Sequence, residues 1–311
     1  MSHVRGLFDF TKSNFTNTIH QEVYPAIAPT RPELSQDGRA ILISGGGNGL
    51  GYNIAQAFVR AAAHTVVIIG RRFDVLVEAR SRLEAETKAA DTNTQIIARA
   101  CDLTDRAQVD ALWKELNDVL GIVVDVFIAN AAKPAQPKRI LEAGTDDIWS
   151  QLEVNAKAPL YLTEKFCSQP GKRQKFIVNV SSGSIHYYTH PGTAARPGAT
   201  LSKMTGTLLF QLIAMETPHE ELQVISYHPG LLWNEYFESL GLPREKFNNS
   251  ELAAAFAVWA ASKEAAFLHG RFAWASWDVE ELATGETREQ IDEDPYFLRS
   301  TIAPLKRGNR A

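Results

Sequence analysis

The chain has 311 residues, and 45% of them are hydrophobic, which is enough to bury the core of one large α/β domain. Its formal net charge of -4 and its pI near 6.1 give no basic surface for nucleic acid or an anionic membrane, so a small molecule is the expected partner. The N-terminus has no secretory pattern, and the apolar runs are too short to span a bilayer. The sequence therefore predicts a soluble cytoplasmic protein, and we assign no metal site.

Residues 1–38 show little periodicity, and the stretch YPAIAPTRPELS carries three prolines, which favour extended backbone. We interpret this segment as an N-terminal arm packed on the rest of the molecule. Residues 39–311 are expected to form a single domain that ends in a C-terminal tail.

Beyond the arm, apolar strands and amphipathic helices alternate. Strands are expected at Arg39 to Ser44, Thr65 to Ile69, Gln95 to Ala100, Val124 to Ala129, Lys175 to Ser181, Leu222 to His228 and Gly270 to Ser276. Helices are expected at Gly49 to Ala63, Asp74 to Lys88, Asp105 to Val119, Asp146 to Cys167 and Ala199 to Glu216. Strands that are apolar on both faces and separated by helices imply a parallel sheet covered on both sides. The predicted fold is a Rossmann-type, doubly wound, seven-stranded parallel sheet in three α/β/α layers.

The stretch SGGGNGLG lies between the first strand and the first helix. Glycines in such a turn let backbone N–H groups and the helix N-terminus approach a pyrophosphate. Because the turn stands inside a βαβ unit, we interpret it as a dinucleotide-binding loop rather than a plain tight turn. The cofactor-binding residues assigned in this loop are Gly45, Gly47, Asn48, Gly49, Leu50 and Gly51.

The second strand ends in Gly70, Arg71 and Arg72, without the carboxylate that would bind a free ribose 2'-hydroxyl. Two guanidinium groups can instead hold a 2'-phosphate. We therefore predict NADP(H) as the cofactor, bound by Arg71 with Arg72 in support. NAD(H) stays the alternative, because either arginine can simply be solvated at the start of the next helix.

With these motifs in view, the chain from about Arg39 to Ser276 resembles the short-chain dehydrogenase/reductase superfamily. The resemblance adds Asp102, Leu103, Asn130, Ala131, Pro229, Gly230 and Leu232 to the expected cofactor site. The chain departs from the family pattern at Ser44 and Asn234, where threonine is usual, and at residues 129–132, where Ala-Asn-Ala-Ala replaces Asn-Asn-Ala-Gly. The terminal segments further resemble a subgroup common among filamentous fungi.

The resemblance also implies the catalytic residues Asn155, Ser182 and Lys203. In the family, a tyrosine precedes the lysine by one helical turn, so both side chains emerge on one face. The lysine lowers the pKa of the phenol and bonds the nicotinamide ribose, the tyrosine exchanges a proton with the substrate oxygen, and the serine holds that oxygen. Asn155 is expected to anchor a water that relays protons. Here the tyrosine position is Ala199, whose side chain has no donor and no titratable proton.

Tyr187, Tyr188, His186 and His190 follow Ser182 in an apparent loop and are the alternative proton donors. A loop phenol lacks the one-turn relation to Lys203, and we interpret the histidines first as residues that line or brace the loop. Three interpretations of Ala199 stay open: an inactivated variant of a tyrosine-containing enzyme, a repurposed non-redox isomerase, cyclase or lyase, or a regulatory protein that keeps its cofactor. The presence of the other catalytic residues favours the first.

The expected substrate pocket comprises Ser184, Tyr187, Tyr188, Trp233, Tyr236 and Phe237. The resemblance places the last three in a substrate lid at about residues 231–250, with ordinary core packing as the alternative. It also places a dimer face on the helices Asp146 to Cys167 and Ala199 to Glu216, so a homodimer or homotetramer is expected. We thus expect an NADP(H)-dependent oxidoreductase that reduces a carbonyl or oxidises an alcohol of a small apolar substrate, impaired in this chain by Ala199.

Overall fold

The computed structural model describes residues 15–233, 235–239 and 241–301. In this part of the chain, seven strands form one parallel sheet in the order β3-β2-β1-β4-β5-β6-β7. Their bounds are β1 Ala40–Ser44, β2 Thr65–Gly70, β3 Gln95–Ala100, β4 Val126–Ala129, β5 Lys175–Val180, β6 Leu222–His228 and β7 Phe272–Trp274. The order reverses direction between β1 and β4, which is the doubly wound topology, so the predicted fold class is confirmed.

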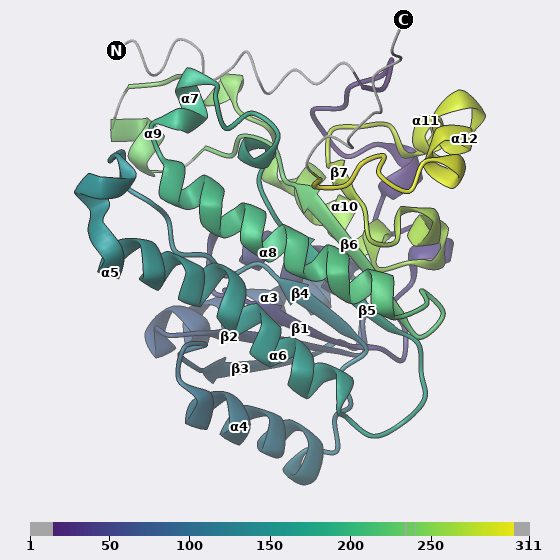
Figure 1. The fold of residues 1–311 in the computed structure, drawn as a ribbon. Coiled ribbons are helices and arrows are strands. Elements are labelled where there is room, and N and C mark those ends of the chain that lie inside the picture. Colours follow the sequence, from purple (N-terminus) through teal and green to yellow (C-terminus); the bar gives the residue numbers. More distant parts are fainter. Residues whose placement is uncertain (1–14, 234, 240, 302–311) are drawn as a thin grey trace, which may run out of the picture.

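Helices cover both faces of the sheet (Figure 1). One face is packed by α2 Gly49–Arg60, α3 Phe73–Ala89 and α10 Ser250–Ala260, and the other by α4 Arg106–Lys114, α6 Ala158–Cys167 and α8 Pro197–Glu216. The inner strands are buried on both faces, as in the run Ala40–Ser44. Each face therefore has its own hydrophobic core, and the carboxyl ends of the strands are left for a site.

The long helix expected from Asp146 begins earlier, at Ile140, and is interrupted twice. Helix α5 (Ile140–Leu152) contains Gly144 with φ +77°, and a π-helical turn η4 (Glu153–Lys157) joins it to α6. The glycine obscured the helical periodicity of the first turns. The π-helical turn inserts one extra residue without ending the helical run, so the hydrophobic periodicity of the sequence could not predict it.

Several helices were not expected. Helix α10 is buried on all sides, so its sequence lacks the amphipathic stripe by which a helix is recognised. The others are the short helices α7 Pro191–Ala194, α9 Glu235–Ser239 and α11 Val279–Leu282, together with α12 Gly285–Glu293. Within the described residues, no helix is both long and apolar enough to cross a membrane.

The described part of the N-terminal arm, residues 15–38, lies along the last elements of the chain. It contains two 3-10 turns, Pro25–Ile27 and Pro32–Leu34, which begin at prolines. Ile27 and Leu34 are fully buried in the core beneath it. A short antiparallel bridge joins Ile19 to Trp277, so the arm is tied to the segment that follows β7.

Candidate active site

The glycine-rich turn after β1 is held by contacts that need small residues. A Cβ on Gly51 would lie 2.2 Å from the carbonyl oxygen of Gly45, so only glycine allows α2 to approach the turn this closely. The Asn130 side chain donates to the Ser44 carbonyl oxygen at 2.9 Å and ties the turn to the end of β4. No side chain caps the start of α2, so the N–H groups of its first turn are available to an anion.

A cavity of about 650 Å³ opens beyond the carboxyl ends of β1 to β4. It lies at the switch point of the sheet, where doubly wound folds bind nucleotides. The predicted cofactor residues that line it are Gly45, Gly47, Asn48, Gly49, Leu50, Gly51, Arg71, Arg72, Asp102, Leu103, Asn130 and Ala131. The fold thus brings together segments from four strand ends, and its size suits a dinucleotide.

The second-strand corner of this cavity carries positive charge. Gly70 lines the wall where a carboxylate would otherwise stand, and Arg71 and Arg72 follow it with exposed side chains. Among the described residues, neither guanidinium has a hydrogen bond or an ion pair. Asp102, in contrast, already accepts hydrogen bonds from the backbone and hydroxyl of Thr104 at 2.9 and 2.8 Å.

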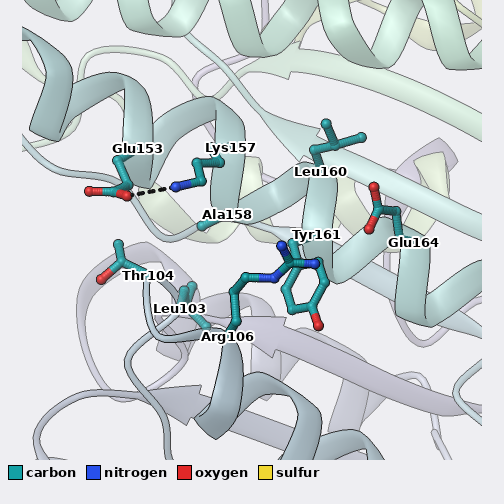
Figure 2. Close-up of a pocket in the computed structure, with 9 residues that line it drawn as sticks. All are labelled: Leu103, Thr104, Arg106, Glu153, Lys157, Ala158, Leu160, Tyr161 and Glu164. Carbon is teal, nitrogen blue, oxygen red and sulfur yellow. Dashed lines mark hydrogen bonds and ion pairs between the residues drawn. The ribbon is translucent and has the colours of Figure 1, made fainter.

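A smaller cavity of about 130 Å³ lies on the outer side of Leu103 and Thr104, between α4 and α6 (Figure 2). Three of its charged groups already have partners: Glu153 and Lys157 are 2.9 Å apart, and the Arg106 guanidinium lies 4.3 Å from the centre of the Tyr161 ring. Its volume is also below the roughly 300 Å³ of ordinary ligand pockets. We therefore take the larger cavity as the ligand site.

Asn155 lies buried in the π-helical turn, in contact with Lys133 of the large cavity's lining. Its Oδ1 accepts from the Lys133 backbone N–H at 2.8 Å, and its Nδ2 donates to Ser202 Oγ at 2.9 Å. Ser202 Oγ in turn donates to the carbonyl oxygen of Ala199 at 3.1 Å. A Cβ on Gly206 would lie 2.5 Å from the Asn155 carbonyl oxygen, so α8 packs directly on the π-helical turn. Asn155 therefore fixes the start of α8 against the end of β4.

Lys203 lies one helical turn after Ala199 on α8, as expected from the spacing. Its Nζ donates to the Val180 carbonyl oxygen at 2.7 Å, at the end of β5. Burial lowers the pKa of Lys203 to about 8, because the ammonium ion loses hydration in this position. The remaining N–H groups of the side chain are available to a ligand.

Ser182 follows β5 and begins the 3-10 turn Gly183–Ile185. Its Oγ accepts from the Ser184 backbone N–H at 3.2 Å, which leaves the hydroxyl proton available for donation. Ser182 and the Nζ of Lys203 thus both lie at the end of β5, and Asn155 contacts α8 through Ser202. Ala199, one turn before Lys203, has no side-chain donor, and its carbonyl oxygen accepts from Ser202 Oγ.

Two of the four alternative proton donors, Tyr187 and His186, pack against β7. The Tyr187 ring packs edge-on against Trp274, with centroids 6.2 Å apart, and the His186 ring packs against Phe272 at 4.8 Å. Tyr188 is 58% exposed. No contact of the described residues brings these side chains to Lys203.

His228, the last residue of β6, supports the same turn. Its ring packs 4.5 Å from Trp274, and a Cβ on Gly183 would lie 3.1 Å from it. Burial, and secondarily the neighbouring His186, lower the pKa of His228 to about 3, so the ring is neutral at physiological pH. Neither ring nitrogen has a partner among the described residues.

The predicted lid residues are only partly described. The Phe237 ring packs 4.8 Å from Phe247, and the Arg244 guanidinium lies 5.4 Å from the Trp233 ring. Asn234 and the Tyr236 side chain lie outside the described residues. Pro229, Gly230 and Leu232 follow β6 and do not line the large cavity, so their assignment to the cofactor stays a prediction.

Sequence reasoning missed two residues that organise the site, Lys133 and Ser202. Lys133 lines the large cavity, and its Nζ donates to Ser150 Oγ at 2.5 Å. Ser202 could have been found from the sequence, because it is a polar residue directly before Lys203, at a position that α8 buries. Lys133 could not, because its backbone rather than its side chain holds Asn155.

Comparisons with known proteins agree with this architecture. A family model described as short chain dehydrogenase matches residues 39–241. The short chain dehydrogenase/reductase AacuD of Aspergillus aculeatus is 30% identical, over 91% of this chain and 94% of its own length. The short chain dehydrogenase/reductase nsrO of Aspergillus novofumigatus is 29% identical, over 91% of this chain and 94% of its own length.

Solved structures share the fold at lower identity. A short-chain type dehydrogenase/reductase from Mycobacterium marinum matches with a TM-score of 0.69 at 19% identity, covering 81% of this chain and 98% of that one. L-sorbose reductase from Gluconobacter frateurii, solved with NADPH and L-sorbose, matches with a TM-score of 0.66 at 19% identity, covering 78% and 96%. With a matching family model, fungal relatives over nearly their full length and a Rossmann site in the expected place, the chain belongs to the short-chain dehydrogenase/reductase family.

Proposed function

We propose that this protein is an NADP(H)-dependent oxidoreductase that interconverts a carbonyl and an alcohol on a small, fairly apolar substrate. The preference for NADP(H) rests on the residues at the end of β2. Gly70 stands where an NAD-binding site would have an acidic residue, and the guanidinium groups of Arg71 and Arg72, unpaired among the described residues, flank the cavity. A 2'-phosphate there would form charge-assisted hydrogen bonds. The complexes of L-sorbose reductase with NADPH and of RhlG from Pseudomonas aeruginosa with NADP support a nicotinamide cofactor in this fold.

The residues of the chain have separable roles in this scheme. The nicotinamide, when bound, supplies or accepts the hydride. Lys203 binds the ribose beside it, and Ser182 donates its hydroxyl proton in a hydrogen bond to the substrate oxygen. Asn155 holds the start of α8 in register with β4 through Lys133 and Ser202. The reaction then still needs a group that exchanges a proton with the substrate oxygen.

That group is absent at position 199. A positioned general acid contributes about 10²- to 10⁴-fold, so we propose that redox activity is impaired in this chain by that order. The presence of Ser182, Lys203 and Asn155 together supports an inactivated reductase over a protein that long ago changed its chemistry. A repurposed isomerase, cyclase or lyase is the second candidate, favoured by the same missing proton donor.

The Ala199→Tyr variant tests the proposal. A tyrosine one turn before Lys203 restores the acid, so NADPH oxidation with a panel of apolar ketones is expected to rise about 10²-fold or more. The matched control is Ala199→Tyr combined with Ser182→Ala, which should lose most of that gain. If tyrosine brings no gain while the parent chain turns over substrate without consuming NADPH, the non-redox candidate replaces the reductase. Bound cofactor without any turnover would point to a regulatory protein.

A separate variant tests the cofactor. Arg71→Ala removes a guanidinium from the proposed 2'-phosphate corner, so the Kd for NADPH is expected to rise about 10-fold or more while the Kd for NADH changes little. Arg80→Ala, on the helix α3 that follows Arg71 and paired with Glu84, removes the same charge away from the cavity and serves as control. Titrations of nicotinamide fluorescence measure both constants. Equal affinity of the parent chain for NADPH and NADH would exclude the NADP(H) assignment.

The apolar substrate class rests on the lid. Its aromatic side chains Trp233 and Phe237 are partly buried beyond the end of β6. Aromatic walls favour apolar or aromatic ligands.

A further inference from the structure

Both ends of the lid meet at one residue, Asn248. Its backbone N–H donates to the Leu231 carbonyl oxygen at 2.9 Å, and its side-chain Oδ1 accepts from the Leu231 N–H at 2.8 Å. A short bridge also pairs Leu232 with Asn248. Asn248 therefore satisfies both backbone groups of Leu231 and closes the loop between residues 231 and 248.

Gly230 makes room for this closure. It has φ +92°, and a Cβ there would lie 2.6 Å from Asn248 Oδ1 and 2.8 Å from Asn248 Cβ. Any other residue at position 230 would displace the Asn248 side chain and would also strain the backbone. The turn after β6 is therefore built around the position of Asn248.

The N-terminal arm holds the opposite side of the same amide. Asn248 Nδ2 donates to Gln21 Oε1 at 2.9 Å, although the two residues are 227 positions apart. With its amino group bonded to Gln21, Asn248 keeps its carbonyl oxygen turned toward Leu231. The arm thus fixes the orientation on which the closure depends.

Gln21 is exposed, but the backbone on either side of it is anchored. The His20 N–H donates to the Ser276 carbonyl oxygen at 2.8 Å, and His20 Nε2 lies 2.7 Å from Asp278 Oδ2. The buried Tyr24 hydroxyl donates to the Trp277 carbonyl oxygen and accepts from the Val279 N–H, at 3.1 and 2.9 Å. Gln21 therefore presents its side chain to Asn248 from a fixed position.

On its other side, the lid base continues into the cofactor half of the fold. Asn249 caps α10 by accepting from the Glu251 N–H at 2.9 Å, and the next residue, Ser250, accepts from Asn53 of α2 at 2.6 Å. Helix α2 begins at the glycine-rich turn. Asn248 thus lies between the arm and the helix that starts at the cofactor cavity.

We propose that Gln21 and Asn248 are positioning residues: the N-terminal arm holds the base of the lid, and thereby sets how tightly the lid closes on the substrate. The inference rests on the proposed function to the extent that residues 231–248 cover a substrate. The hydrogen bonds at the lid base join residues of this chain only, so they are testable separately from catalysis.

The first experiment measures hydrogen–deuterium exchange of the full chain without ligand, in peptides that cover residues 231–248. Gln21→Ala removes one hydrogen bond at the lid base, so exchange in these peptides is expected to rise roughly 2- to 10-fold. Gln21→Glu keeps an acceptor for Asn248 Nδ2 and should exchange like the parent chain. Glu22→Ala, an exposed neighbour on the same arm, is the matched control.

The second experiment measures steady-state kinetics in the Ala199→Tyr background. Gln21→Ala is expected to raise the substrate KM roughly 2- to 10-fold, with kcat changed less than about 2-fold, because it loosens the lid and leaves Ser182 and Lys203 in place. Gln21→Glu should restore the parent KM.

Unchanged exchange in Gln21→Ala, or an equal rise in Glu22→Ala, would overturn the proposal whatever the activity. Faster exchange with an unchanged KM would also overturn it, because the arm would then stabilise the loop without acting on the substrate. If Ala199→Tyr has no activity, the proposed function fails instead, and binding of ketone substrates to the NADPH complex replaces KM as the readout.

Discussion

The contacts of Lys203 show the surroundings of the lysine when alanine occupies position 199. In the family scheme the ammonium ion acts on a phenol one turn away, but here its hydrogen-bond partner is the Val180 carbonyl oxygen. A single neutral partner compensates only part of the hydration that the charge loses on burial, so the pKa falls to about 8. At physiological pH a fraction of the lysine side chains is therefore neutral in the cofactor-free protein.

This shift predicts a pH dependence of stability. Well below pH 8 the lysine is protonated in both the folded and unfolded states, so the folded state bears the full cost of the buried charge. Between about pH 8 and the unfolded pKa of 10.5, the folded state releases the proton while the unfolded state keeps it, so the free energy of unfolding rises with pH. Lys203→Met is expected to remove this rise.

Urea unfolding of the cofactor-free protein between pH 7 and 10 measures the effect. The two curves of unfolding free energy against pH should diverge above pH 8, with the steeper rise in the parent chain. Lys88→Met removes an exposed lysine at the end of α3 and should leave the slope unchanged. Parallel curves for Lys203→Met and the parent chain would show that burial does not shift this lysine.

At the scale of elements, the strands were the predictable part of the fold. β3 and β6 have the predicted bounds, because short runs that are apolar on both faces end at polar or turn residues. Helices were predictable only where one face is polar. The all-apolar α10 and the interrupted α5 carried no usable stripe, since tertiary packing rather than local sequence decides where they begin.

In the candidate site, the sequence predicted which backbone segments meet, but it did not predict the side-chain contacts between packed helices. The glycine turn and the residues after β2, β3 and β4 converge on one cavity, because parallel strands place their carboxyl ends at one edge. The contacts of Asn155 with Lys133 and Ser202 were not predictable, since they depend on the π-helical turn η4 and on the close approach of α8 at Gly206. Such contacts follow from the packing of whole helices.

At the scale of the whole molecule, the outer face of α8 exposes several large apolar side chains, as an association surface does. Leu201, Leu208, Leu212 and Met215 recur at helical spacing on it and are 39–63% exposed, and Trp149 of the neighbouring α5 is 66% exposed. α5 and α8 lie side by side on one side of the molecule (Figure 1). Large contiguous apolar patches of this kind usually mark interaction sites, so we propose that two copies of the chain associate through this face.

Leu212→Glu tests the association. A carboxylate in the centre of a two-fold apolar interface would be buried twice, so the variant is expected to be monomeric where the parent chain is a dimer or tetramer. Light scattering after size-exclusion chromatography measures the mass. Val119→Glu adds the same charge at an apolar position that is 73% exposed and lies off this face, and it should keep the parent mass. If the parent chain is itself monomeric, the proposed association through α8 is wrong.

The arm also has a consequence for the order of events during synthesis. Its partners Ser276, Trp277 and Asp278 are among the last described residues to leave the ribosome, whereas β1 to β4 can pair much earlier. The apolar residues of the arm therefore remain unpacked while the nucleotide-binding half folds, because their final partners have not yet been synthesised. The lid base, which depends on Gln21, is then completed only near the end of translation, so a chain released early would fold its cofactor cavity and still lack a properly held lid.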